Sequence, residues 1–181
     1  MKNLLLTGAS GGIGSEIAQY ASEAGYRVGL IDIDQKKLEE TQSKIKNSIV
    51  LRADITQESS VLEALQSFGK VPDALINCAG LVRFGGLLEQ EVKDFEDVIN
   101  VNLLGCFIVS CSVAKLMKKN GSGNIINISS ISGGKHPAIH SGAYAATKAG
   151  VAMLSEQMSL ESVSYTHLRA HETRHDLVCR L

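Results

Sequence analysis

The chain carries no excess of either charge and no long apolar run. Lys and Arg number 18 and Asp and Glu number 19, so the net charge of −1 offers no basic surface to nucleic acid or membranes. No segment approaches the ~20 apolar residues of a membrane span, and no signal-peptide pattern precedes the first apolar run. We therefore expect a cytoplasmic protein whose 181 residues form one domain.

Cysteine is sparse as well. Four cysteines lack Cys-x-x-Cys spacing and the density of a disulfide-rich domain: Cys78, Cys106, Cys111 and Cys179. We expect the first three to be small buried residues in a reducing compartment, and we expect no metal site. Internal repeats and low-complexity linkers are also missing.

A glycine-rich segment follows the first apolar run. Residues 2–7 have the length of a strand, Gly8 to Gly14 (Gly-Ala-Ser-Gly-Gly-Ile-Gly) form a turn, and helical periodicity follows. Glycines there let the backbone approach a pyrophosphate, which N–H groups and the helix dipole then hold. The same turn could serve only as a tight connection. A Walker A loop is excluded, because Ser15 and Glu16 follow where a lysine is required.

An acidic residue ends the second apolar run. Asp32 stands eighteen residues after Gly14, where a dinucleotide-binding unit uses a carboxylate to accept hydrogen bonds from the adenosine ribose. Such a carboxylate repels a 2′-phosphate, so the sequence favours NAD over NADP. A helix cap is the alternative reading, but Asp34 fits the cap of the next helix better.

Tyr144 and Lys148 stand four residues apart in a predicted helix, so their side chains share one face. The Lys148 ammonium favours the phenolate form of Tyr144, which makes the phenol a candidate acid or base near neutral pH. Ser130, fourteen residues before Tyr144, could hydrogen-bond the same substrate oxygen. The trio suits interconversion of a carbonyl and an alcohol. By itself the Tyr-Lys spacing also fits a packed ring beside a solvated charge.

Strand-like and helix-like stretches alternate, which predicts an α/β fold with a doubly wound parallel sheet, the Rossmann fold. Right-handed crossovers give the strand order 3-2-1-4-5. The predicted strands lie near residues 2–7, 27–32, 48–52, 73–77 and 124–129. The predicted helices lie near residues 12–25, 35–46, 57–68, 91–119 and 142–161. A cofactor would bind at the carboxyl ends of the strands.

From Met1 to about Glu161 the chain resembles the short-chain dehydrogenase/reductase family. The resemblance rests on five motifs in order: the Thr7–Gly14 turn, Asp54 in Arg-Ala-Asp-Ile-Thr, Asn77-Cys-Ala-Gly80, Asn102, and Ser130 with Tyr144 and Lys148. Asn100 competes with Asn102 for the helix Asn of the family. Cys78 replaces a family Asn, which puts a local hydrogen bond in doubt but not the fold.

The resemblance implies a hydride-transferring oxidoreductase that uses NAD, or NADP, on a small carbonyl or alcohol substrate. It implies Asn102, Ser130, Tyr144 and Lys148 as catalytic residues, with Asn102 holding a water that links Lys148 to solvent. It also implies a homodimer or homotetramer paired through the helices at 91–119 and 142–161. The implied cofactor-binding residues are Gly8, Ser10, Gly12, Ile13, Gly14, Asp32, Asp54, Ile55, Asn77, Ala79, Gly80, Tyr144 and Lys148. A nucleotide-binding regulatory or scaffold protein without catalysis is the alternative.

The sequence pattern changes after Glu161. Residues 163–173 resemble the in-frame translation of a transposon-derived sequencing adapter, so we expect 162–181 to be a non-native or disordered tail. Residues 1–161 are then an incomplete family domain, truncated before strands six and seven. We accordingly expect strand five to be an exposed edge and the chain itself to have little turnover. His167, His171 and His175, spaced like zinc ligands on a helix, are a weaker reading of the tail.

Overall fold

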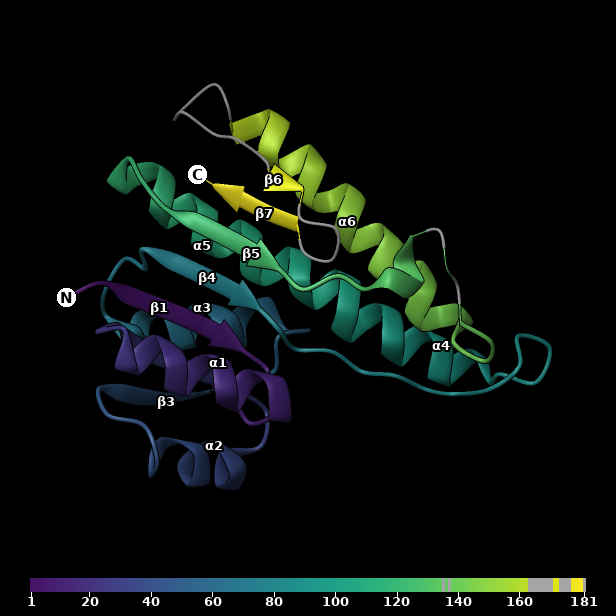
Figure 1. The fold of residues 1–181 in the computed structure, drawn as a ribbon, viewed down its shortest axis with the longest axis horizontal. Helices are drawn as coiled ribbons and strands as arrows, with labels where there is room; N and C mark the ends of the chain where they lie inside the picture. The colour runs from purple at the N-terminus through teal and green to yellow at the C-terminus, as the bar shows by residue number, and fades with distance from the viewer. Residues whose placement is uncertain (135, 137, 163–170, 173–176, 181) are drawn as a thin grey trace.

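The structure is a β-sheet with helices on both faces (Figure 1). It is a computed structural model that describes residues 1–134, 136, 138–162, 171–172 and 177–180. The strands are β1 (Asn3–Thr7), β2 (Arg27–Asp32), β3 (Ser48–Arg52), β4 (Ala74–Asn77), β5 (Asn124–Asn127), β6 (His171–Glu172) and β7 (Leu177–Arg180). The helices are α1 (Gly12–Glu23), α2 (Gln35–Gln42), α3 (Glu58–Phe68), α4 (Val92–Ile99), α5 (Cys106–Asn120) and α6 (Gly142–Ser162). A π-helical segment, η1 (Asn100–Gly105), joins α4 to α5, and a 3-10 turn, η2 (Ile131–Gly133), follows β5.

Two apolar clusters fill the space between the sheet and its helices. Successive strand residues point to opposite faces, so Leu4 and Leu6 of β1 pack with α1 and α2, whereas Leu5 packs with α3 and α5. Met158 of α6 packs against the cluster that contains Leu5. The apolar runs of the sequence thus become the two sides of one buried sheet.

The order β3-β2-β1-β4-β5 is parallel, which confirms the predicted topology. Thr7 pairs with Asn77, and Asn77 pairs with Asn127, so β1, β4 and β5 end side by side. This carboxyl edge is where a parallel α/β sheet binds its ligand.

The exposed-edge expectation for strand five is wrong within the described residues. β7 pairs antiparallel with β5 from Asn127 to Asn124, and β6 pairs antiparallel with β7 (Figure 1). The backbone groups of β5 thus find a partner that the sequence pattern did not indicate. Residues 163–170, 173–176 and 181 lie outside the described residues, so the adapter-like, non-native or disordered tail stays a prediction. His167 and His175 lie there too, and the backbone at His171 belongs to a strand.

The single helix predicted at 91–119 is interrupted by η1, which the sequence did not predict. Gly105 packs against Ile55 so closely that a Cβ there would lie 2.8 Å from the Ile55 side chain. The sequence analysis predicted no segment of membrane-spanning length, but in the described chain Val92–Asn120 is long and apolar enough to cross a membrane by length and composition alone. Its apolar content includes Val109, Val113 and Met117, which are buried against the sheet.

Candidate functional site

The turn between β1 and α1 needs glycine at two positions. Gly8 has φ +69°, and a Cβ there would lie 2.7 Å from the backbone of Ala79. A Cβ on Gly14 would lie 2.1 Å from the Gly8 carbonyl oxygen. A Cβ on Gly12 would meet nothing within 4 Å, so the turn is open on that side. The turn is therefore packed tightly against the segment that follows β4, and it exposes its backbone where a pyrophosphate could approach.

Asp32 ties the end of β2 to this turn. Its Oδ2 accepts hydrogen bonds from the Ser10 N–H (3.1 Å) and the Ser10 hydroxyl (2.6 Å), and its Oδ1 accepts from the Ile33 N–H at 2.8 Å. Asp34 caps α2 as predicted, by accepting from the Lys37 N–H at 3.1 Å. That hydrogen bond lowers the pKa of Asp34. Asp32 is thus held in place at the rim of the turn.

A cleft of about 510 Å³ lies at the carboxyl ends of the strands. Asp54 is held beside it by an Asx turn, in which Oδ1 accepts from the Thr56 N–H (2.9 Å) and hydroxyl (2.7 Å). The predicted cofactor-binding residues that line the cleft are Gly8, Ser10, Gly12, Ile13, Gly14, Asp32, Asp54, Ile55, Ala79 and Gly80. Of the remaining three, Tyr144 and Lys148 line an adjoining cleft and Asn77 faces the interior.

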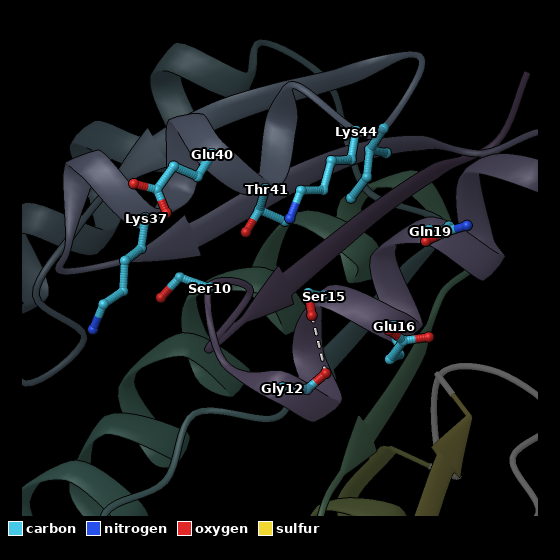
Figure 2. Close-up of a pocket in the computed structure, with 10 residues that line it drawn as sticks. Ser10, Gly12, Ser15, Glu16, Gln19, Lys37, Glu40, Thr41 and Lys44 are labelled. Carbon is cyan, nitrogen blue, oxygen red and sulfur yellow. Dashed lines mark hydrogen bonds between the residues drawn. The ribbon is translucent and has the colours of Figure 1, made fainter.

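A smaller cavity of about 280 Å³ lies between α1 and α2 (Figure 2). It shares Ser10, Gly12 and Lys37 with the cleft. Its other ionisable lining groups are of both signs, because Lys44 and two glutamates contribute to it. The cavity thus offers no field of a single sign next to Asp32.

Asn77 belongs to a buried polar network rather than to the cleft wall. Its Nδ2 donates to Ser110 Oγ and to Asn127 Oδ1, both at 2.8 Å. Asn127 Nδ2 donates to Ser155 Oγ of α6 at 2.8 Å. The network joins β4, β5, α5 and α6, and of its members only Asn77 could be singled out from the sequence. Asn77 and Asn127 each end a strand, which was the available signal.

Thr7 holds the backbone at Cys78, the position where the Asn-to-Cys change put a local hydrogen bond in doubt. It is fully buried, and its hydroxyl oxygen accepts from the N–H groups of Cys78 and Ala79, both at 3.2 Å. The backbone after β4 is therefore fixed without a side chain at position 78. Cys78 lines both the cofactor cleft and the cleft beside Tyr144.

Burial keeps Cys78, Cys106 and Cys111 in the thiol form rather than the reactive thiolate form. Burial raises the pKa of Cys106 to about 11 and raises the pKa values of Cys78 and Cys111. Cys106 is buried as predicted, whereas Cys78 and Cys111 are partly exposed. Among the described residues, no cluster of His, Cys, Asp or Glu is placed to hold a metal ion.

Lys148 and Tyr144 lie together on α6, as their spacing predicted. Lys148 is only 5% exposed, and its Nζ donates to the Ile128 carbonyl at 2.6 Å. The same atom lies 5.7 Å from the centre of the Tyr144 ring. Burial lowers the pKa of Lys148. A partly desolvated cation thus stands beside the phenol at the base of a second cleft of about 430 Å³.

Asn102 uses its side chain to join two elements of the site. Its Oδ1 accepts from the Leu81 N–H at 2.7 Å, and its Nδ2 donates to the Leu81 carbonyl (2.9 Å) and to Thr147 Oγ1 (3.1 Å). A void of about 10 Å³, lined partly by Asn102 and Lys148, adjoins it. That volume is close to the minimum that one water molecule requires. Thr147 and Leu81 were not singled out from the sequence.

Ser130 has a local structural role in addition to its predicted one. Its Oγ accepts from the Ser132 N–H at 3.2 Å and so caps η2. Ser132 is the residue of this turn that lines the cleft beside Tyr144. The neighbouring Ser129 donates to the Lys148 carbonyl at 2.9 Å, which holds this turn against α6.

The fold and the cleft together define a nucleotide-binding α/β protein with a Tyr-Lys pair beside its ligand cleft. Residues 2–171 match the family model described as short chain dehydrogenase, and the chain belongs to that family. An uncharacterized oxidoreductase of Thermotoga maritima is 32% identical over 170 residues, covering 91% of this chain and 67% of the relative. The 3-oxoacyl-acyl-carrier-protein reductase of Staphylococcus epidermidis is 35% identical over 172 residues, covering 90% of this chain and 70% of the relative.

Solved structures share the same fold. A 3-ketoacyl-acyl-carrier-protein reductase from Brucella melitensis, complexed with NADH, superposes with a TM-score of 0.86 at 26% identity, covering 91% of this chain and 71% of that one. An actinorhodin polyketide ketoreductase variant with NADPH superposes with a TM-score of 0.84 at 30% identity, covering 91% of this chain and 66% of that one. The chain thus spans about two thirds of the length of these relatives.

Proposed function

We propose that this protein is an NAD-dependent oxidoreductase that interconverts a carbonyl and an alcohol. The observation that carries the proposal is the position of Lys148 Nζ, which is buried 2.6 Å from the Ile128 carbonyl and 5.7 Å from the centre of the Tyr144 ring. Both Tyr144 and Lys148 line the cleft that shares Ile13, Cys78, Gly80 and Leu81 with the cofactor cleft. A proton-transfer pair at that junction can serve a substrate held against a dinucleotide.

The residues of the site divide the chemistry between them. A bound nicotinamide dinucleotide would supply or accept the hydride at the substrate carbon. The Tyr144 hydroxyl gives a proton to the carbonyl oxygen in reduction and takes it back in oxidation, and the Lys148 charge favours the phenolate that remains. Ser130 Oγ accepts from the Ser132 N–H, which leaves the Ser130 O–H free to donate to the substrate oxygen, as the hydroxyl of Ser132, which lines the cleft, also can. The void beside Asn102 supports a water that returns a proton to Lys148.

Residues of the chain fit the dinucleotide itself. The open side of Gly12 would admit the pyrophosphate, and the Asp32 carboxylate would accept from the ribose hydroxyls. One of the solved structures contains NADH and the other contains NADPH, so the comparison does not distinguish between the two cofactors for this chain. We propose NAD, because Asp32 is negative and the adjoining cavity carries charges of both signs.

The test of the function is Tyr144→Phe, measured under single-turnover conditions with the protein in excess over NADH. Loss of the proton donor is expected to slow NADH-dependent reduction of a ketone by about 10²-fold or more while leaving the Kd for NADH unchanged. Tyr26→Phe is the matched control, because Tyr26 packs with the α1 side of the sheet and not at the cleft. An unchanged rate in Tyr144→Phe would refute the proposed role.

Turnover by the 181-residue chain is expected to be slow. The ring of Phe84, which lines the Tyr144 cleft, is open to solvent, since Phe84 is 77% exposed. Water that enters the site weakens the electrostatic contribution of Lys148. The alternative, a nucleotide-binding scaffold without catalysis, predicts that NADH binds and that no ketone is reduced even at protein excess.

We also infer self-association through the outer surfaces of the helices that flank the site. Leu104 of η1, Phe107 of α5 and Met153 of α6 are 42%, 46% and 63% exposed, and α6 packs beside η1 where Gly150 contacts Leu103. Apolar side chains gathered on neighbouring helices favour a protein partner. A reducing cytoplasmic location is proposed with it, supported by three cysteines without disulfides among the described residues.

A further inference from the structure

The walls of the cleft beside Tyr144 are mostly hydrocarbon. Its volume of about 430 Å³ falls in the range of small-molecule sites. The apolar residues that line it are Ile13, Leu81, Val82, Phe84, Ile128 and Ala138. A ligand that enters the cleft therefore meets aliphatic and aromatic groups over most of its surface.

Few polar groups in this cleft are available to a ligand. The Lys148 Nζ donates to the Ile128 carbonyl, and the Ser141 hydroxyl donates to the Ala138 carbonyl at 2.8 Å. Within the described chain, the hydroxyls of Tyr144 and Ser132 make no hydrogen bond to protein. Both residues line the cleft, so each hydroxyl is free to hydrogen-bond a polar oxygen of a ligand.

Charged ligand groups find no free partner among the cleft residues that the structure describes. Among the described residues that line the cleft, Lys148 is the only one with a charge, and it is buried against a carbonyl. Arg83, near the rim, pairs with Asp94 at 3.5 Å. A phosphate or carboxylate would lose hydration without gaining a cation, and a polyol would leave hydroxyls without partners.

The apolar wall is held at a fixed position relative to Tyr144. The Gly85 N–H donates to the His140 carbonyl at 3.1 Å, and Gly85 forms a bridge with Ser141 at the start of α6. Leu87 contacts Gly142 so closely that a Cβ there would lie 2.5 Å from it. The segment that carries Phe84 is thus anchored to the helix that carries Tyr144.

We infer that the substrate is an uncharged ketone, or the corresponding alcohol, whose reacting oxygen is flanked by hydrocarbon. An alicyclic ketone is the simplest member of this class. This inference rests on the proposed function, because it takes Tyr144 as the partner of the reacting oxygen. It excludes sugars, polyols and phosphorylated ketones from the substrates that the proposed function alone would allow.

The inference is tested by binding to the purified chain saturated with NAD⁺. Isothermal titration with decalone, sorbitol and dihydroxyacetone phosphate compares an apolar ketone, a polyol and a charged ketone. Decalone is expected to bind about tenfold more tightly than either of the others, because it buries apolar surface without stranding polar groups. Equal or tighter binding of sorbitol or the phosphate, or no binding of decalone, would overturn the inference.

A pair of exposed aromatic residues provides matched variants. Phe84→Ser removes part of the apolar wall and is expected to weaken decalone binding about fivefold while NAD⁺ binds as before. Tyr20→Ser removes a ring that is 76% exposed on α1 and is expected to change neither. Unchanged decalone binding in Phe84→Ser contradicts the inferred site. Failure of the parent chain to bind NAD⁺ instead contradicts the proposed function, so the two failures are distinguishable.

Discussion

At the scale of single residues, Lys148 combines burial with a neutral partner. Its Nζ donates to the Ile128 carbonyl, and burial lowers its pKa. In the folded state the ammonium thus holds its proton less firmly than in the unfolded chain, where the pKa is near the ordinary 10.5. Below the folded pKa the charged form costs stability, and this cost disappears as pH rises toward 10.5.

Comparison with Lys148→Met tests whether the contribution of Lys148 to stability rises with pH. Because the unfolded state binds more protons in that window, the free energy of unfolding of the parent relative to Lys148→Met is expected to increase with pH up to about 10.5. Urea titrations of both proteins at a series of pH values measure the difference, in which the titration of groups remote from Lys148 cancels. A difference that falls with rising pH would show that the folded protein stabilises the Lys148 charge.

Asp32 controls the choice of dinucleotide if its carboxylate faces the ribose. Asp32→Ala is expected to weaken NADH binding by about tenfold and to narrow the preference over NADPH, because an acceptor and a repulsive charge are both lost. Fluorescence titration with each dinucleotide gives the ratio of the Kd for NADPH to the Kd for NADH. Asp34→Asn removes the same charge two residues away while retaining an α2 cap, so its ratio should stay that of the parent. A similar change in both variants would point to net charge rather than to ribose contact.

Residue types and spacing predicted some of these positions but not their orientation. The helix cap formed by Asp34 could be predicted, because a cap is a local feature, whereas the ribose-binding role of Asp32 stays a prediction. The inward orientation of Asn77 could not, because it depends on Ser110 and Asn127, which are distant in sequence. The cap formed by Ser130 depends on a 3-10 turn that has no apolar periodicity.

At the scale of elements, the parallel strands follow from their apolar runs, but element ends and interruptions do not. The predicted helix at 35–46 ends at Gln42, because Lys44 and Ile45 donate to the Thr41 and Gln42 carbonyls in tighter turns. β5 ends at Asn127 rather than at 129, where the buried network and the η2 turn take over. Such ends are decided by tertiary hydrogen bonds, which propensity does not contain.

The network around Asn127 is expected to hold β5 and α6 together. Asn127 is 1% exposed and bonds to Asn77 and Ser155, so Asn127→Ala strands buried polar groups and should destabilise the protein by about 2–3 kcal/mol. Asn124→Ala, at the partly exposed other end of the same strand, should cost about 0.5 kcal/mol or less. Urea unfolding of the two variants measures both losses of stability. Equal losses would show that the network does not hold β5 and α6 together.

At the scale of the whole molecule, the outer surfaces of η1, α5 and α6 are expected to bind a second copy. Phe107→Glu places a charge on this apolar surface, which should shift the mass measured by light scattering from dimer or tetramer toward monomer. Leu62→Glu, on α3 and 50% exposed in the parent, is the control and should leave the mass unchanged. A monomeric parent, or a Phe107→Glu protein with the parent's mass, would contradict the assembly.

The π-helical segment at Asn100–Gly105 has a consequence for the phase of the long helix. An α-helix advances about 100° per residue, so the extra residue in a wider turn offsets the two halves by one position. With that offset, Asn102 reaches Leu81 and Thr147 while Val109 and Val113 still face the sheet. In a uniform α-helix with one residue fewer, either Asn102 would face Leu81 and Thr147 or Val109 and Val113 would face the sheet, but not both. The π-helical segment therefore sets the helix phase so that the core residues face the sheet and Asn102 faces the cleft.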